Sequence, residues 1–190
     1  MQRRIRKAEK EGLSYEVGSR EFLEPFYALL VTTRKRHHLI PQPRAWFQNL
    51  IHCMGDKLQI RLARKDGRPI AAMLTLRHGS TATYKYGCSD HEFHNLAGMP
   101  FLFWKLIEDS KNSGATSLDL GRSDLNQPGL LTFKNRLGAR QQTLTYFRYP
   151  QVAKADVTER AGMGVMRRMV SLVPSAALPV AGSVFYRHLG

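Results

Sequence analysis

Residues 58–87, LQIRLARKDGRPIAAMLTLRHGSTATYKYG, predict the sheet around which the rest of the chain is arranged. Asp66-Gly67 is a strong signal for a tight hairpin turn, and Gly79-Ser80 marks a second turn. The segments LQIRLAR, PIAAMLTLRH and TATYKYG have the length and composition of strands. Connections this short join neighbouring antiparallel strands, so this stretch predicts a three-stranded meander.

The sequence after the meander predicts a loop, a helix, a strand, a short helix and a last strand. The loop runs from Cys88 to Met99, and the helix from Pro100 to Asn112 with Gly114 at its end. The remaining elements are the strand and loop TSLDLGRSD (116–124), the helix PGLLTFKNRLGA (128–139) and the strand QQTLTYF (141–147). Because a helix connects the meander to the next strand, that strand is expected to lie near the meander.

Three helices are predicted before the meander. Arg3 to Glu11 is charged and stops at Gly12, whereas Phe22 to Lys35 and Pro43 to Met54 repeat apolar residues at helical spacing. The predicted fold class is therefore α+β. Its sheet is mixed, with an antiparallel meander followed by helix-strand-helix-strand, and the N-terminal helices are added to it. Residues 1–150 are expected to form this domain.

Residues 151–190 are predicted to form a helical C-terminal appendage. Thr158 to Ser171 has a helical pattern, and residues 169–186 carry no charge. The length of the uncharged run is borderline for a membrane span, but Pro174, Pro179 and Gly182 argue against one. Two short helices that begin at prolines, and that pack on the domain or lie on a membrane surface, are expected instead.

The chain is strongly basic. It has 29 Lys and Arg residues against 15 Asp and Glu, a net charge of +14, which favours anionic partners such as nucleic acid, phosphorylated substrates or membrane surfaces. One basic cluster is Arg3, Arg4, Arg6 and Lys7, and another is Arg34 to Arg36. The first cluster has two interpretations: a solvated helix face, or a patch that binds phosphate or faces a membrane.

Cysteine and histidine spacing does not predict a metal site. Cys88, His91 and His94 form neither an HExxH motif nor a pair of CxxC motifs, so no metal is expected. Two cysteines, Cys53 and Cys88, do not make a disulfide framework, so a reducing cytosol is the default compartment.

The short helix 128–139 carries the residue most suggestive of chemistry. Leu130, Phe133 and Leu137 form one apolar stripe, and Lys134 lies on it. A lysine there either extends its ammonium to the edge of the stripe or aims it at a reacting group in a pocket. Just upstream, Asp119 with Arg122 is either a structural ion pair or part of a catalytic site.

The motifs of this region resemble those of the FemAB-like acyltransferases of the GNAT superfamily. The matching pieces are Leu118-Asp119-Leu120-Gly121-Arg122-Ser123, Gly129-Leu130, Phe133-Lys134 and Gly138-Ala139, with RRIRKAEKE (3–11), ARKDGRPIAA (63–72) and YKYGCSD (84–90) upstream. The resemblance covers residues 3–149 in family order. It implies a GNAT-type fold that corresponds to the second of the two GNAT-like halves usual in such proteins.

The resemblance implies transfer of an acyl or aminoacyl group, from acyl-CoA or aminoacyl-tRNA, to an amine of a cell-envelope or exopolysaccharide precursor. Lys134 would stabilise the tetrahedral oxyanion, and Phe133 would shape the pocket beside it. Arg122 would hold a substrate phosphate or carboxylate. The other implied substrate-binding residues are Ser123, Asp119, Asp124 and Tyr86. The base that deprotonates the amine is not identified, and Asp119 and Asp124 are the candidates. The lack of an evident Ser-His-Asp or Cys-His arrangement favours direct transfer.

A second interpretation is a non-catalytic half that binds an anionic partner, such as a lipid-linked sugar phosphate or tRNA. GNAT enzymes that bind acyl-CoA usually carry a Gly-rich loop before the helix that begins near residue 100, and this sequence has only Gly98 there. That departure argues against CoA binding by this chain. Either interpretation places the protein in the cytoplasm, with peripheral contact at the inner membrane surface.

Overall fold

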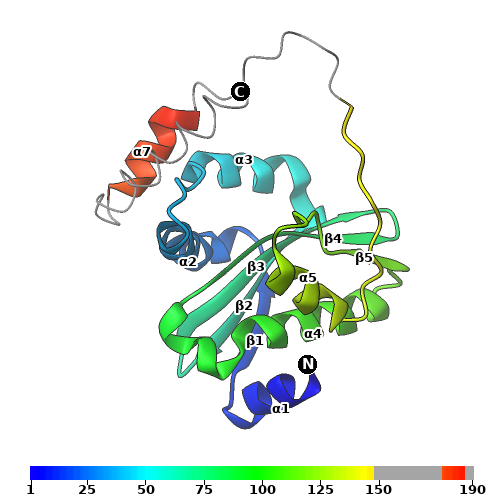
Figure 1. Cartoon of the computed structure of the whole chain (residues 1–190). Coiled ribbons are helices and arrows are strands. Elements are labelled where there is room, and N and C mark those ends of the chain that lie inside the picture. The colour runs from blue at the N-terminus through cyan, green and yellow to red at the C-terminus, as the bar shows by residue number, and fades with distance from the viewer. Residues whose placement is uncertain (148–176, 187–190) are drawn as a thin grey trace.

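A computed structural model describes residues 1–147 and 177–186. It contains one five-stranded sheet with the order β1-β2-β3-β4-β5, covered by helices on both faces (Figure 1). The strands are β1 Ser14–Gly18, β2 Leu58–Lys65, β3 Arg68–His78, β4 Thr81–Ser89 and β5 Ser117–Asp119. The helices are α1 Gln2–Lys10, α2 Leu23–Arg36, α3 Arg44–Met54, α4 Gly98–Asn112, α5 Pro128–Asn135 and α7 Leu178–Phe185. Short 3-10 helices cover Arg20–Phe22, Gly55–Lys57 and His91–Leu96.

The predicted meander is confirmed. β2 pairs antiparallel with β3, and β3 with β4. The first turn uses left-handed backbone at Asp66 and Gly67, with φ of 50° and 78°. β5 then pairs parallel with β4, from Thr81↔Ser117 to Thr83↔Asp119, after the α4 crossover. The α+β fold with a mixed sheet is therefore present.

The two faces of the sheet bury separate apolar cores, because alternate residues of a strand point to opposite faces. On β3, Ala72 and Leu74 pack with α2 and α3, whereas Ala71 and Met73 pack with α1 and α4. Figure 1 shows α2 and α3 on one side of the sheet and α4 on the other. Phe133 and Leu137 attach α5 and the residues after it to the α4 side.

Strand β1 was not predicted from the sequence. It forms the edge of the sheet, pairing antiparallel with β2 from Ser14↔Arg64 to Gly18↔Ile60. Of its side chains only Tyr15 packs against a core, while Val17 is exposed. A five-residue edge strand that buries so little leaves no clear apolar alternation for sequence analysis to detect.

Several boundaries differ from prediction on the C-terminal side of the meander. The helix predicted over 128–139 ends at Asn135. The expected loop from Cys88 to Met99 contains the end of β4 and a 3-10 helix, and α4 begins at Gly98 rather than at Pro100. Asp90 caps the 3-10 helix by accepting a hydrogen bond from the Glu92 N–H at 3.1 Å.

The predicted last strand, residues 141–147, does not form. Gly138 takes a φ of 84° after α5, and the following residues run exposed, with Phe147 at 94% exposure. The alternating pattern of QQTLTYF indicates which side chains could share a face, but a strand also needs a backbone partner. No strand of the described chain pairs with this segment.

Only part of the predicted appendage falls within the described residues. Helix α7 carries Pro179 in its first turn, and its Leu178 is fully buried in the core beneath α2. A Cβ on Gly182 would lie 2.4 Å from the Pro41 oxygen, so α7 packs closely on the chain before α3. The predicted helix from Thr158 to Ser171 lies outside the described residues. No helix within 1–147 or 177–186 combines the length and apolar character needed to cross a membrane.

Candidate functional site

The candidate site lies where β4 and β5 part. Their last paired residues are Thr83 and Asp119, although β4 continues to Ser89. Just beyond this point β4 contains a bulge, because Tyr84 lies opposite Thr75 and Tyr86 opposite Leu74, which leaves Lys85 without a partner. Bulges break the alternation of a strand and re-aim its side chains.

A tight turn follows β5. The Asp119 Oδ1 accepts a hydrogen bond from the Gly121 N–H at 2.7 Å, which bends the chain as β5 ends. Gly121 has a φ of 70°, and a Cβ on it would lie 3.6 Å from the Tyr84 carbonyl oxygen. The turn therefore stays against the bulged part of β4.

Lys134 reaches this turn from α5. Its Nζ donates hydrogen bonds to the Gly121 and Arg122 carbonyl oxygens, at 2.6 and 3.2 Å. An ammonium has three donors, so one N–H is left without a partner in the described chain. Burial lowers the pKa of Lys134 below its ordinary value, and nearby Asp119 opposes this shift. The sequence offered two positions for this ammonium, an edge or a pocket. In the structure its Nζ lies on two carbonyl oxygens of the turn that follows β5.

An aromatic row connects the bulge to α5. The Tyr84 and Phe103 ring centroids are 4.7 Å apart, and those of Phe103 and Phe133 are 5.2 Å apart. Burial raises the pKa of the Tyr84 phenol above its ordinary value, so it stays protonated. Phe133, predicted to shape a pocket, packs through this row on α4 and the sheet.

Arg122, Ser123 and Asp124 follow the turn. The Arg122 Nη1 donates to the Tyr146 hydroxyl at 3.3 Å, and its Nε lies 3.6 Å from an Asp124 carboxylate oxygen. The alternative pairing of Arg122 with Asp119 is not found, because the Asp119 carboxylate caps its own turn. The Ser123 Oγ is buried and has no hydrogen-bond partner in the described chain.

Tyr86 does not lie with the other predicted site residues. Without the bulge at Lys85, Tyr84 and Tyr86 would share a face; with it, Tyr84 packs on the α4 side and Tyr86 on the α2 side. The Tyr86 ring is 5.2 Å from that of Phe47, and its hydroxyl accepts from the Trp46 Nε1 at 3.2 Å. The structure therefore places Tyr86 against α3.

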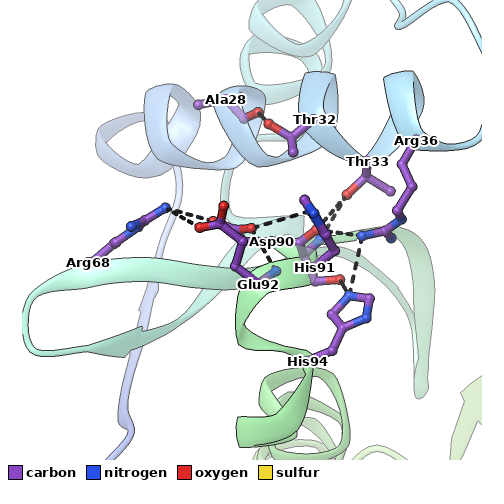
Figure 2. A network of polar contacts seen from close by, with 10 residues as sticks. Ala28, Thr32, Thr33, Arg36, Arg68, Asp90, His91, Glu92 and His94 are labelled. Carbon is purple, nitrogen blue, oxygen red and sulfur yellow. Dashed lines mark hydrogen bonds and ion pairs between the residues drawn. The ribbon is translucent and has the colours of Figure 1, made fainter. Parts of the chain in front are cut away.

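The three residues considered for a metal are separated. Cys88 is buried against α2, and its Sγ lies 3.6 Å from the Phe26 carbonyl oxygen. His94 Nε2 lies 2.9 Å from the Ser89 Oγ and 3.3 Å from the Arg36 Nη1 (Figure 2). Burial, and then Arg36, lower the pKa of His94, which favours the neutral ring. Within the described residues, no three metal-binding side chains come together. The Ser89–His94 contact had no sequence signal.

Comparison with known proteins places this fold in a family. The sequence model of the acetyltransferase (GNAT) domain matches residues 1–135. The chain belongs to this GNAT family. No curated protein matches its sequence.

Several solved structures share the GNAT fold of this chain. FemX superposes with a TM-score of 0.63 at 16% identity, covering 70% of this chain and 51% of its own. The aminoglycoside acetyltransferase meta-AAC0020, from an uncultured soil metagenomic sample, superposes with a TM-score of 0.59 at 13% identity. The match covers 75% of this chain and 99% of that enzyme's chain. The aminoglycoside N-acetyltransferase AAC(6')-Iy in complex with CoA superposes with a TM-score of 0.57 at 12% identity. The match covers 74% of this chain and 95% of that enzyme's chain. This GNAT chain thus spans about half the length of the FemX chain.

The start of α4 does not fit the pyrophosphate of a CoA donor. A helix N-terminus binds such a group through free N–H groups that face open space. In this GNAT chain, Pro100 lacks an N–H, and both Gly98 and Pro100 are buried. A Cβ on Gly98 would lie 3.0 Å from the Ala71 Cβ, so this turn packs on β3. The absence of the Gly-rich loop from the sequence agrees with this packing.

Proposed function

We propose that this GNAT chain takes part in the transfer of an acyl or aminoacyl group to an amine of a cell-envelope or exopolysaccharide precursor. The observation that carries the proposal is the fixed ammonium of Lys134. Transfer to an amine passes through a tetrahedral oxyanion, which positioned donors stabilise. Two carbonyl oxygens position the Lys134 Nζ at the end of β5, and one N–H remains for the oxyanion.

Neighbouring groups supply the substrate contacts in this proposal. The exposed guanidinium of Arg122 offers donors to a phosphate or carboxylate, and Asp124 limits its movement. Ser123 brings to the same turn a buried hydroxyl that has no partner among the residues the structure describes, and such a group gains from a substrate hydrogen bond. Asp119 fixes the turn itself. The donor, acyl-CoA or aminoacyl-tRNA, would be held away from the first turn of α4.

Direct transfer agrees with the surroundings of the Ser89–His94 contact. His94 meets the cation Arg36 beside Ser89, and a nearby cation disfavours the protonated imidazole that would form when serine gives up its proton. The contact is better explained as holding the 3-10 helix to α2 and to the end of β4.

The test is turnover with acetyl-CoA and with alanyl-tRNA as donors and amine-bearing envelope precursors as acceptors. Lys134→Met should lower the rate by roughly a hundredfold or more, the loss typical of one oxyanion donor. Lys134→Arg should restore little, because the planar guanidinium cannot occupy the same two-carbonyl position. Lys111→Met, an exposed lysine near the end of α4, is the matched control. Wild-type turnover by Lys134→Met, with an unchanged unfolding temperature, would remove Lys134 from the mechanism.

The second proposal is a non-catalytic half that binds an anionic partner, lipid-linked or tRNA, at the membrane surface. The buried first turn of α4 favours it, because the usual donor site of a CoA-dependent enzyme is not built there. Binding of the precursor or of tRNA without turnover of either donor would support this function over the first.

A further inference from the structure

A cavity of about 500 Å³ lies between α1 and α5, on residues that are far apart in the sequence. Three arginines line it: Arg3 and Arg4 from α1, and Arg136 at the end of α5. Pro128, Gly129, Thr132 and Phe133 of α5 complete the wall, together with Met1. Its volume is within the range of small-molecule sites.

None of the three guanidiniums has an acidic partner or a hydrogen bond in the described chain. Other arginines of this protein do: Arg44 pairs with Glu24, Arg64 with Glu16 at 3.0 Å, and Arg68 with Asp90 at 2.8 Å. Like charges gathered around one cavity repel each other, and the repulsion is relieved when an anion enters.

The cavity is distinct from the candidate acyl-transfer site. Phe133 lines it, but the adjacent Lys134 points to the turn after β5 and does not. Arg122, Ser123 and Asp124 do not line it either. A ligand in this cavity would therefore occupy the α1 side of α5, while Lys134 serves the β5 side.

We propose that this cavity binds the diphosphate group of a phosphorylated small molecule. A guanidinium binds phosphate oxygens through paired donors, and three of them match a diphosphate better than a single carboxylate. The apolar surfaces of Phe133 and Pro128 would contact the carbon skeleton attached to the phosphates. A nucleoside diphosphate and a lipid-linked diphosphate share this chemistry. The proposal goes beyond acyl transfer, because it concerns binding alone. Its lipid-linked form rests on the second proposed function, since a lipid-linked diphosphate is one such anionic partner.

The test is calorimetric titration of the full chain with inorganic pyrophosphate at low salt, followed by UDP and by phosphatidylcholine vesicles containing a polyprenyl diphosphate. Arg4→Gln and Arg136→Gln should each weaken pyrophosphate binding about tenfold or more, as expected when a charge-assisted hydrogen bond is lost. Arg6→Gln and Arg140→Gln remove the same charge nearby without touching the cavity, and should change the affinity only about twofold. Tighter binding of UDP or of the vesicles than of pyrophosphate identifies the source of the diphosphate.

Gly129→Asp gives an independent test. A Cβ at Gly129 meets nothing within 4 Å, and a carboxylate in the first turn of a helix is favourable, so the variant should fold normally. Its negative charge on the cavity wall should abolish pyrophosphate binding. The proposal is wrong if the wild type does not bind pyrophosphate, if the control variants lose as much affinity as the cavity variants, or if a short RNA duplex binds while pyrophosphate does not.

Discussion

Lys134 should give the reaction an alkaline limit that reflects its surroundings. Burial lowers its pKa below the ordinary 10.5, so the ammonium is lost at a lower pH than that of an exposed lysine. Burying the charged ammonium lowers the stability of the folded state at low pH. This penalty disappears as the pH rises from the pKa of Lys134 in the folded chain to its pKa in the unfolded chain. If the ammonium is the oxyanion donor, the turnover rate should fall with a midpoint below 10.5, while the folded state persists.

The measurement is the turnover rate against pH, with folding followed by circular dichroism at each point. The residual activity of Lys134→Arg should not show this fall, because guanidinium keeps its proton throughout the range. An identical alkaline limit in the variant would assign the titration to another group.

Arg61 of β2 organises a second polar cluster, which joins β1, β2 and α4. Its side chain is only 5% exposed, and it donates to the Tyr15 hydroxyl at 3.0 Å and to the Gln59 Oε1 at 2.7 Å. Tyr15 in turn donates to Asp109, whose carboxylate lies 3.6 Å from the Arg61 Nε. Burial raises the pKa of Tyr15, which keeps it a donor. The arrangement reads as structural, because most of these donors and acceptors satisfy one another.

Removing Arg61 should therefore destabilise the fold without a direct effect on Lys134. Arg61→Met leaves the partners of a buried cation unsatisfied and should cost about 3 kcal/mol of unfolding free energy. Arg64 also lies on β2, and Arg64→Met, which breaks its more exposed pair with Glu16 of β1, should cost under about 1 kcal/mol. Urea unfolding measures both. Equal losses of unfolding free energy in the two variants would show that the buried cluster around Arg61 stabilises the fold no more than the exposed Arg64–Glu16 pair does.

At the scale of elements, the β4 bulge decides which side chains reach the candidate site. Gly87 permits the bulged conformation of Tyr84, because a Cβ there would lie 2.0 Å from the Tyr84 hydroxyl oxygen and 2.9 Å from the Met99 methyl. Gly87→Ala should therefore destabilise the protein by roughly 1–3 kcal/mol, the usual cost of overpacking. Tyr84→Phe in the same chain should recover part of this loss, since it removes the nearest atom. Gly129→Ala, with open space at its Cβ, is the control.

Unfolding free energies of the single and double variants form a cycle that isolates the clash. If the losses from Gly87→Ala and Tyr84→Phe simply add, the two residues do not interfere. The lack of a side chain at Gly87 would then not be what permits the bulged conformation of Tyr84.

Sequence patterns predicted those elements whose signals are local. The hairpin at Asp66-Gly67 and the apolar stripes of α2 and α3 depend on neighbouring residues, and these elements formed as predicted. Strand formation at 14–18 and at 141–147 depends on which backbone is available for pairing. The sequence analysis therefore missed β1 and predicted a strand over 141–147 that does not form. The bulge at Lys85 left no sequence signal, so Tyr86 was grouped with residues on the other face of the sheet.

The same limit applies to the candidate sites in the whole molecule. Lys134 could be singled out from the sequence, because an isolated cation on an apolar stripe is a local anomaly. The meeting of Arg136 with Arg3 and Arg4 could not, since more than a hundred residues separate them and only the packing of α1 and α5 on α4 brings them together. Ser123 gave no sign of burial either, because its environment is set by distant segments.

The net charge of +14 should make the stability of the whole molecule depend on salt in a defined direction. Ion pairs such as Arg64–Glu16 and Arg68–Asp90 weaken as salt is added, which lowers stability. Salt also screens the repulsion among the surplus cations, and this raises the stability of the folded state. Since exposed pairs contribute little individually and the cations outnumber the acids almost two to one, repulsion should dominate.

The urea midpoint should therefore rise from low to physiological sodium chloride concentration, where screening acts beyond about 8 Å. Arg4→Gln and Arg136→Gln should each reduce this rise, because each removes one of the three cations gathered around one cavity. A midpoint that falls with salt would instead show that the ion pairs outweigh the repulsion.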